Sequence, residues 1–82
     1  MSDFDGLEIG RRGREVLARV AGVDADALRP EQNLVGDLGI DSVKALQLVM
    51  QLEDALGIEI SDDDASKMDK VGDVLGYLAS RG

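Results

Sequence analysis

The sequence contains no cysteine, histidine or tryptophan, and only one phenylalanine, one tyrosine and one proline. Without cysteine the chain can form neither disulfides nor thiolate nucleophiles, and without histidine it lacks the commonest general base and metal ligand. Because aromatic residues are so few, the core must consist of Leu, Val, Ile, Ala and Met, which favours packed helices over a sheet. We therefore expect an all-α domain in which any thiol chemistry comes from an attached group.

The chain has 82 residues, and 17 Asp and Glu against 9 Lys and Arg give it a net charge of −8. This length fits one small domain, residues 1–82, with little room for a deep active site. The negative charge disfavours nucleic acid and anionic membranes, and it favours basic patches on other proteins. No apolar run reaches the roughly 20 residues of a membrane span, and the chain does not start like a signal peptide. We expect a cytoplasmic protein.

Hydrophobic periodicity predicts a first helix over residues 8–21, after a frayed lead-in over residues 1–7. Gly10 and Gly13 each cost this helix roughly 1 kcal/mol relative to alanine, and Gly22 is a natural end. The next segment, up to Ile40, has no sustained period and should form a long loop, a feature that usually carries function. Three leucines are expected to hold this loop against the core: Leu28, Leu34 and Leu38.

Capping residues predict three further helices, so the expected fold is a four-helix bundle with a short third helix. Asp41 is a good N-cap for a helix of about 15 residues that ends at Gly57. Ser61 begins a capping-box-like pattern for a short helix to about Met68. Asp69 is the expected cap of the last helix, in which four apolar residues follow the i, i+3, i+4, i+7 pattern: Val71, Val74, Leu75 and Leu78.

The second helix carries two apolar stripes. The stripe assigned to the core consists of Ala45, Leu48, Val49, Leu52 and Leu56. A second ridge, roughly 120° away by the helical step, consists of Val43, Leu46 and Met50. This ridge is either a docking surface for a partner or a second buried face covered by the long loop or the last helix.

Ser42 follows the predicted cap, in the first turn of the second helix. Free backbone amides and the positive end of the helix dipole favour an anionic group there. With no histidine in the chain, and with Lys44 on a different helix face, Ser42 is poorly equipped as a nucleophile of its own. It is better suited to accept a modification, although a serine with only a structural role would also fit this position.

The acidic residues do not form a recognisable metal site. An EF-hand loop opened at Asp62 would need glycine at its sixth position and glutamate at its twelfth, where this chain has Lys67 and Asp73. Asp37 and Asp41, four residues apart across a glycine turn, could share a cation, but we interpret them as solvated loop carboxylates. We therefore predict no bound metal.

Residues 33–60 resemble an acyl carrier protein. The similarity centres on Asp37-Leu38-Gly39-Ile40-Asp41-Ser42-Val43, which is similar to the Asp-Ser-Leu modification motif of that family. It continues through a Leu-Val-Met-x-Leu-Glu pattern and the Ile-x-Ile that follows, and the helical plan fits over about residues 8–80. The resemblance implies a non-catalytic, monomeric carrier whose Ser42 accepts 4′-phosphopantetheine from coenzyme A. A separate Mg²⁺-dependent phosphopantetheinyl transferase would catalyse this step, and the thiol of the arm would hold acyl groups as thioesters.

The resemblance also implies two sets of residues. A face for the transferase and for acyl-processing enzymes with basic docking patches would comprise Asp37, Asp41, Val43, Lys44, Leu46, Gln47, Met50, Glu53 and Asp54. An interior that can receive an acyl chain would comprise Leu34, Leu38, Leu48, Ile58, Ile60, Ala65, Met68, Leu75 and Leu78.

Three positions depart from the pattern of carriers in primary fatty-acid synthesis. Lys44 and Gln47 stand where those carriers usually have acidic residues, and Val43 replaces the usual leucine. Because surface charge mainly sets partner choice and encounter rate, we expect a specialised carrier for polyketide-like, lipid-modifying or amino-acyl chemistry rather than the housekeeping fatty-acid carrier. The alternative hypothesis is an unmodified helical adaptor that docks a partner through Val43, Leu46 and Met50.

Overall fold

The protein is a bundle of helices, as expected from its composition. The computed structural model describes residues 2–81, and within them the side chains of residues 8–80. The elements are α1 (Ser2–Ala21), the 3-10 helix η1 (Ala25–Ala27), α2 (Ser42–Leu56), α3 (Asp62–Ser66) and α4 (Val71–Arg81). No strand occurs in this part of the chain, where the only β pairing is an isolated bridge between Asn33 and Lys70. The predicted all-α fold with a short third helix is confirmed.

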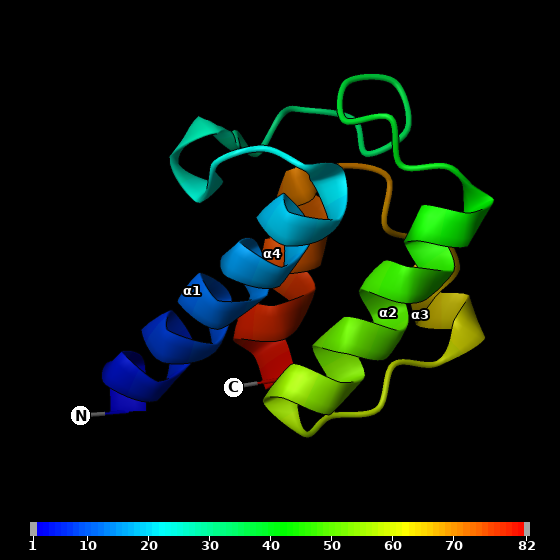
Figure 1. Cartoon of the computed structure of the whole chain (residues 1–82). Helices are drawn as coiled ribbons and strands as arrows, with labels where there is room; N and C mark the ends of the chain where they lie inside the picture. Colours follow the sequence, from blue (N-terminus) through cyan, green and yellow to red (C-terminus); the bar gives the residue numbers. More distant parts are fainter. Residues whose placement is uncertain (1, 82) are drawn as a thin grey trace.

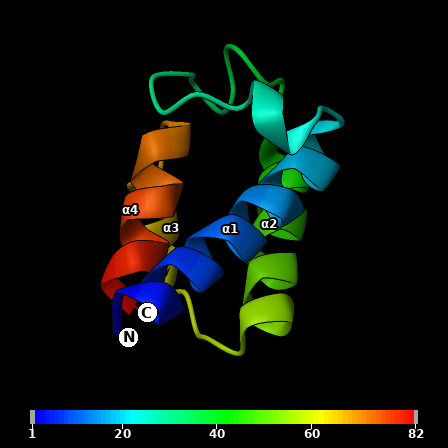
Figure 2. The same cartoon turned by 90° about the vertical axis from the view of Figure 1, so that its left-hand side faces the viewer.

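Helix α1 packs against both α2 and α4, and it joins the two sides of the bundle (Figure 1). A view from the side shows α4 and α2 on either side of α1, with the long loop across one end (Figure 2). None of the described helices is long and apolar enough to cross a membrane.

The core is entirely apolar among the described residues. Its buried members come from every long helix and from the loop: Val16, Leu17, Ala18, Leu28, Leu34, Ile40, Leu48, Leu52, Ile60, Val71, Val74 and Leu78. Two of the three leucines predicted to hold the loop, Leu28 and Leu34, are buried, and Leu38 is half-buried against the core. The prediction of a loop held to the core by leucines is therefore confirmed.

One residue of the predicted core stripe of α2 does not lie in the core. Leu48 and Leu52 are buried and Val49 and Leu56 are half-buried, but Ala45 is exposed. The prediction for Ala45 is therefore wrong. A small cavity remains there, between α2, the loop and the end of α3.

The helix α1 begins at Ser2, so the predicted start at Glu8 is wrong, and residues 2–7 are helical rather than a frayed lead-in. Met1 lies outside the described residues. Gly13 is buried, and a Cβ added to it would overlap Cδ1 of Leu78. The glycine therefore allows α1 to approach α4 closely, and this packing outweighs the low helix propensity of glycine.

The ends of α2 and the start of α3 follow their predicted caps. The Asp41 carboxylate accepts a hydrogen bond from the backbone N–H of Lys44, at 2.9 Å, and Gly57 ends the helix with a φ of 66°. Ser61 Oγ accepts from the N–H of Asp64 at 3.1 Å, and α3 then ends at Ser66, slightly before the predicted Met68.

The predicted cap of α4 is wrong. The carboxylate that serves this end belongs to Asp73, whose Oδ2 accepts from the N–H groups of Asp69 and Lys70, each at 3.0 Å. Hydrogen bonds from the amides of Lys70 and Asp69 hold the pKa of Asp73 below its ordinary value. The backbone carbonyl of Asp69 instead accepts from the N–H of Leu34, at 2.8 Å. Asp69 thus contributes to loop attachment through its backbone.

Two alanine substitutions in α1 test the close approach of α1 and α4. Gly13→Ala should lower the free energy of unfolding by about 1–3 kcal/mol, because the new methyl group overpacks against Leu78. Gly10→Ala is the matched control, since a Cβ there meets nothing within 4 Å, and it should raise stability by up to about 1 kcal/mol. The free energy of unfolding of both variants is measured by urea denaturation. Equal gains from the two substitutions would contradict the packing described.

Candidate functional site

Ser42 is the first residue of α2, and its side chain is exposed. The first amides of a helix have no partner within the helix, and the aligned peptide dipoles place partial positive charge at this end. Asp41 satisfies the amide of Lys44 and so fixes the start of the helix directly before Ser42. The arrangement presents a hydroxyl at a position that favours an attached anionic group.

The loop before Ser42 is fixed to the core. Ile40 is buried, and its N–H donates to the carbonyl of Leu34 at 2.9 Å. The Asp37 carboxylate accepts from the N–H of Asn33 at 2.7 Å and closes the turn that leads to Gly39, which has a φ of 67°. Because the residues before it are held in place, Ser42 has a defined position at the surface.

Both loop carboxylates are engaged with the backbone. Asp37 and Asp41 each accept a hydrogen bond from a nearby backbone N–H. Among the described residues there is no group of three or more acidic side chains that could hold a metal ion. Both residues are exposed, and in this chain their carboxylates organise the backbone on either side of Ile40.

The second apolar ridge of α2 is exposed. The side chains of Val43, Leu46 and Met50 are 66%, 62% and 58% exposed, so neither the long loop nor α4 covers them. The structure therefore rules out the alternative in which this ridge is a second buried face. A run of large apolar side chains on one face of a helix, beside an exposed serine, is typical of a docking surface.

Charged and polar side chains flank this ridge unevenly. Lys44 and Gln47 are exposed near the start of α2, and Asp54 is exposed near its end. A partner that docks along α2 therefore meets a cation near Ser42 and acidic groups farther along the helix. From residue 44 to residue 54 the helix rises by about 15 Å, at 1.5 Å per residue.

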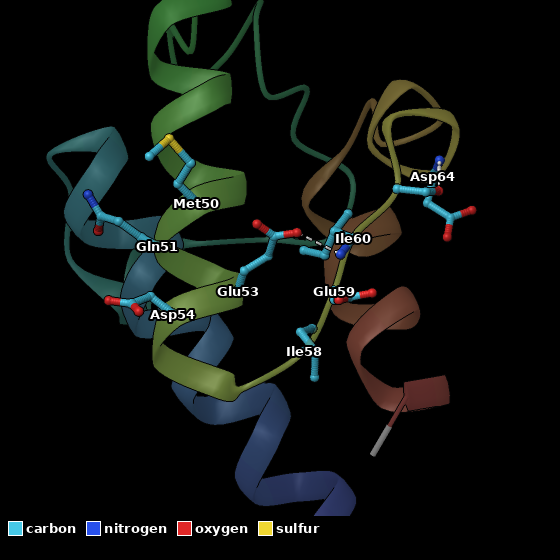
Figure 3. Close-up of a pocket in the computed structure, with 9 residues that line it drawn as sticks. Met50, Gln51, Glu53, Asp54, Ile58, Glu59, Ile60 and Asp64 are labelled. Atoms are coloured by element: carbon cyan, nitrogen blue, oxygen red, sulfur yellow. Dashed lines mark hydrogen bonds between the residues drawn. The ribbon is translucent and has the colours of Figure 1, made fainter.

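Glu53 differs from the other predicted recognition residues, because its carboxylate is bound within the protein. It is half-buried, and its Oε2 accepts from the N–H of Ile60 at 2.8 Å, which ties α2 to the segment before α3 (Figure 3). The spacing of seven residues offered no sequence pattern by which this bond could be predicted.

An open groove of about 1030 Å³ runs between the second half of α2 and the segment that leads to α3. Its lining residues are Met50, Gln51, Glu53, Asp54, Ile58, Glu59, Ile60, Ser61 and Asp64 (Figure 3). Four of these side chains are acidic and none is basic. The groove therefore extends the predicted recognition face with residues that sequence analysis did not assign to it, such as Glu59 and Asp64.

A second, smaller cavity of about 100 Å³ lies between α2, the long loop and the end of α3. Its lining is apolar: Leu34, Val35, Ile40, Ala45, Leu48, Val49, Ala65 and Met68. Four of the nine residues predicted to form an acyl-chain interior are among them, namely Leu34, Leu48, Ala65 and Met68. Of the others, Ile58 and Ile60 line the groove, while Leu38, Leu75 and Leu78 pack in or against the core.

Sequence analysis did not assign Ala45 and Val49 to the cavity, although their spacing indicates that they lie together. They are four residues apart on α2 and so share one helix face. Val35 and Ile40 lie in the loop, where no periodicity indicates which side chains turn inward. Their place in the cavity follows from the attachment of the loop to the core.

The bond between Glu53 and Ile60 can be tested by substitution. Glu53→Ala should lower the free energy of unfolding by about 1–3 kcal/mol, because the part-buried N–H of Ile60 loses its acceptor. Glu53→Gln should lose less, since the amide oxygen can still accept this bond. Asp54→Ala, an exposed neighbour, is the control and should change stability little. If Glu53→Ala matched Asp54→Ala in urea unfolding, the bond would not hold this segment.

Comparison with known proteins identifies similar chains over almost the whole length. A family model described as a phosphopantetheine attachment site matches residues 14–78. A candidate acyl carrier protein from Mycobacterium tuberculosis has 35% sequence identity and a TM-score of 0.81, with 90% of this chain and 99% of that chain covered. The thermally stable acyl carrier protein from Enterococcus faecalis has 31% identity and a TM-score of 0.76, with 94% and 98% covered.

Proposed function

Because the chain belongs to the phosphopantetheine-attachment family of acyl carrier proteins, we propose that it carries acyl groups on a 4′-phosphopantetheine arm attached to Ser42. We assign the arm to Ser42 because of the position of this residue. Its hydroxyl is exposed at the first residue of α2, directly beside the exposed ridge of Val43, Leu46 and Met50.

The residues around Ser42 fit a phosphodiester. The free amides and the dipole at the start of α2 favour the negative charge of the phosphate. The carboxylate of Asp41 is engaged with the N–H of Lys44, so its charge is partly compensated within the cap. The exposed side chain leaves room for a long substituent.

In the proposed modification, Ser42 Oγ forms a bond to the pantetheine-bearing phosphorus of coenzyme A. The bond from that phosphorus to the bridging oxygen breaks, and adenosine 3′,5′-bisphosphate leaves. A base of a separate Mg²⁺-dependent transferase takes the hydroxyl proton. The attached arm ends in a thiol that holds acyl groups as thioesters, which supplies the sulfur chemistry that this cysteine-free chain lacks.

The chain itself holds the acyl group and presents it to partner enzymes, and these enzymes catalyse the reactions. The apolar ridge offers a contact area for the transferase and for acyl-processing enzymes. The acidic groove beyond Met50 attracts basic docking patches, and electrostatic attraction of this kind mainly raises the association rate.

We propose a specialised pathway, polyketide-like, lipid-modifying or amino-acyl, rather than bulk fatty-acid synthesis. This proposal rests on the exposed Lys44 and Gln47, which replace the acidic residues usual in fatty-acid carriers and lie next to the attachment site. A cation at this position disfavours partners whose docking surface is basic throughout.

The site of attachment is tested by intact mass. After incubation with coenzyme A, Mg²⁺ and a broad-specificity phosphopantetheinyl transferase, the wild-type protein should gain the mass of one phosphopantetheine, and Ser42→Ala should gain none. Circular dichroism confirms that the variant is folded. A gain in Ser42→Ala would place the arm on another residue.

The same experiment separates the carrier from the adaptor hypothesis. Family membership favours the carrier. If the folded, previously unmodified wild type gained no mass, the adaptor would be the better interpretation. Met50→Glu would then be expected to abolish partner binding while Ser42→Ala left it unchanged.

The proposal on pathway is tested by charge substitution. Lys44→Asp combined with Gln47→Glu should raise kcat/KM with a malonyl transferase of bacterial fatty-acid synthesis by about tenfold at low salt, and high salt should remove the gain. Arg19→Asp with Ala27→Glu adds the same charge on α1 and η1, at exposed positions away from the ridge, and serves as the control. No gain at low salt, or an equal gain in the control, would contradict the proposed role of Lys44 and Gln47.

A further inference from the structure

A row of polar side chains runs beside the apolar ridge of α2. Its members follow the spacing i, i+3, i+7, i+10 and so share one helix face: Lys44, Gln47, Gln51 and Asp54. In Figure 3, Gln51 and Asp54 point to the same side of α2, whereas Glu53 points to the other side, toward Ile60. Glu53 is the only charged residue of α2 outside this polar row. The ridge lies between the two sides.

The polar row changes its charge from one end to the other. Lys44 places a cation in the first turn of α2, and Asp54 places an anion in the last turn. The two glutamines between them are neutral and can both donate and accept hydrogen bonds. None of these four side chains has a hydrogen bond or an ion pair within the described part of the chain, where the one ion pair joins Arg11 to Glu8. The polar groups of the row are therefore available to a second molecule.

This order of charges makes the face complementary to itself in one orientation. When two copies lay their α2 helices side by side and antiparallel, a two-fold axis relates them, and each residue meets a different residue of the other copy. An axis level with Val49 places Lys44 of each copy opposite Asp54 of the other, because both residues are equally far from it along the helix. In the same way Gln47 lies opposite Gln51. Both charge pairs are attractive, and the glutamine amides can exchange hydrogen bonds.

The antiparallel orientation also suits the ridge, and the parallel orientation does not suit the polar row. Parallel helices would set Lys44 opposite Lys44 and Asp54 opposite Asp54, and facing like charges oppose association. Antiparallel helices place Leu46 of each copy beside Met50 of the other. Both side chains are exposed in the single chain, so their contact removes apolar surface from water.

The size of this face limits the strength of the pairing. It spans residues 43–54, about 16 Å of a helix that is about 10 Å wide, and it offers three large apolar side chains per copy. A stable interface buries about 800 Å² on each partner, more than one helix face of this length supplies. The net charge of −8 on each chain also opposes association. The pairing is therefore weak and reversible, with a Kd of roughly 0.1–1 mM.

We infer that this chain forms a weak antiparallel dimer with a second copy of itself, in which α2 pairs with α2 through the apolar ridge and the polar row. The dimer covers the ridge that the proposed function assigns to enzymes, so at high concentration the carrier competes with them for its own docking surface. The monomer implied by the family resemblance is the dilute form. The dimer requires no arm on Ser42, so this inference goes beyond the proposed function and does not depend on it.

Sedimentation equilibrium of the unmodified full chain measures the pairing. At about 0.15 M salt, repulsion between charges more than about 8 Å apart is screened, whereas facing charges at the interface still interact. The weight-average mass should rise from that of one chain at about 10 μM toward that of two chains at about 2 mM. In ¹⁵N NMR spectra over the same range, the exposed residues of α2 should shift, and the exposed Ala79 on α4 should not.

Charge substitutions distinguish the facing pairs from the effect of net charge. Lys44→Asp makes the chain more negative and Asp54→Lys makes it less negative, but each sets like charges opposite one another. Both should raise the Kd of the dimer at least about tenfold. The double variant restores opposite charges and keeps the net charge of −8, because its two changes cancel. Its Kd should return to within about threefold of the wild-type value.

Two further variants test the location of the interface. Arg19→Asp with Asp26→Lys reverses two charges at exposed positions of α1 and η1, outside α2, and should leave the Kd unchanged. Met50→Glu places a carboxylate between the paired ridges and should abolish the dimer. Circular dichroism confirms that each variant is folded.

The results that would overturn the dimer are distinct from those that test the attachment site. The mass of one chain at about 2 mM, or concentration-dependent shifts outside α2, would overturn the inference. So would a dimer that Asp54→Lys does not weaken, or a double variant that stays as weak as the single ones. None of these results bears on the mass gain at Ser42, which tests the proposed function. The absence of that mass gain, in turn, leaves the dimer to be decided by sedimentation.

Discussion

Three backbone hydrogen bonds between the long loop and the start of α4 determine where Ser42 lies. They join the N–H of Leu34 to Asp69 O at 2.8 Å, the N–H of Val71 to Gln32 O at 3.0 Å, and the N–H of Gly72 to Pro30 O at 2.9 Å. A Cβ on Gly72 would come within 3.1 Å of that same carbonyl oxygen, so glycine allows the loop to lie this close. With the loop fixed there, Leu34 and Ile40 enter the core, and α2 begins at a defined point on the surface.

The placement of α2 matters because one face of this helix packs in the core and another face is exposed to solvent. Leu48 and Leu52 face the core and hold the helix in the bundle, while Val43, Leu46 and Met50 stay exposed. Exposed apolar side chains of this size contribute nothing to the stability of the isolated chain, since their burial requires another molecule. The exposure of the ridge fits the contact surface proposed for partners, and the stability of the domain comes from the opposite face of the helix and from α1 and α4.

Local chemistry made α2 predictable from sequence. Its cap at Asp41, its end at Gly57 and the exposed serine between cap and ridge all follow from interactions within a few residues. The features that could not be predicted depend on contacts between distant parts of the chain. At the start of α4, the carboxylate of Asp73 accepts from the N–H groups of Asp69 and Lys70, while the backbone carbonyl of Asp69 accepts from the loop residue Leu34. In α1, Gly13 fits against Leu78, a residue far away in sequence.

The cavity and the groove both border α2, and they differ in their position around the helix. Ala45 and Val49 line the cavity, whereas Met50 and Glu53 line the groove, and each set is turned about 100° from the other around the helix. The apolar lining of the cavity and the four carboxylates of the groove therefore present different chemistry to a molecule that approaches α2.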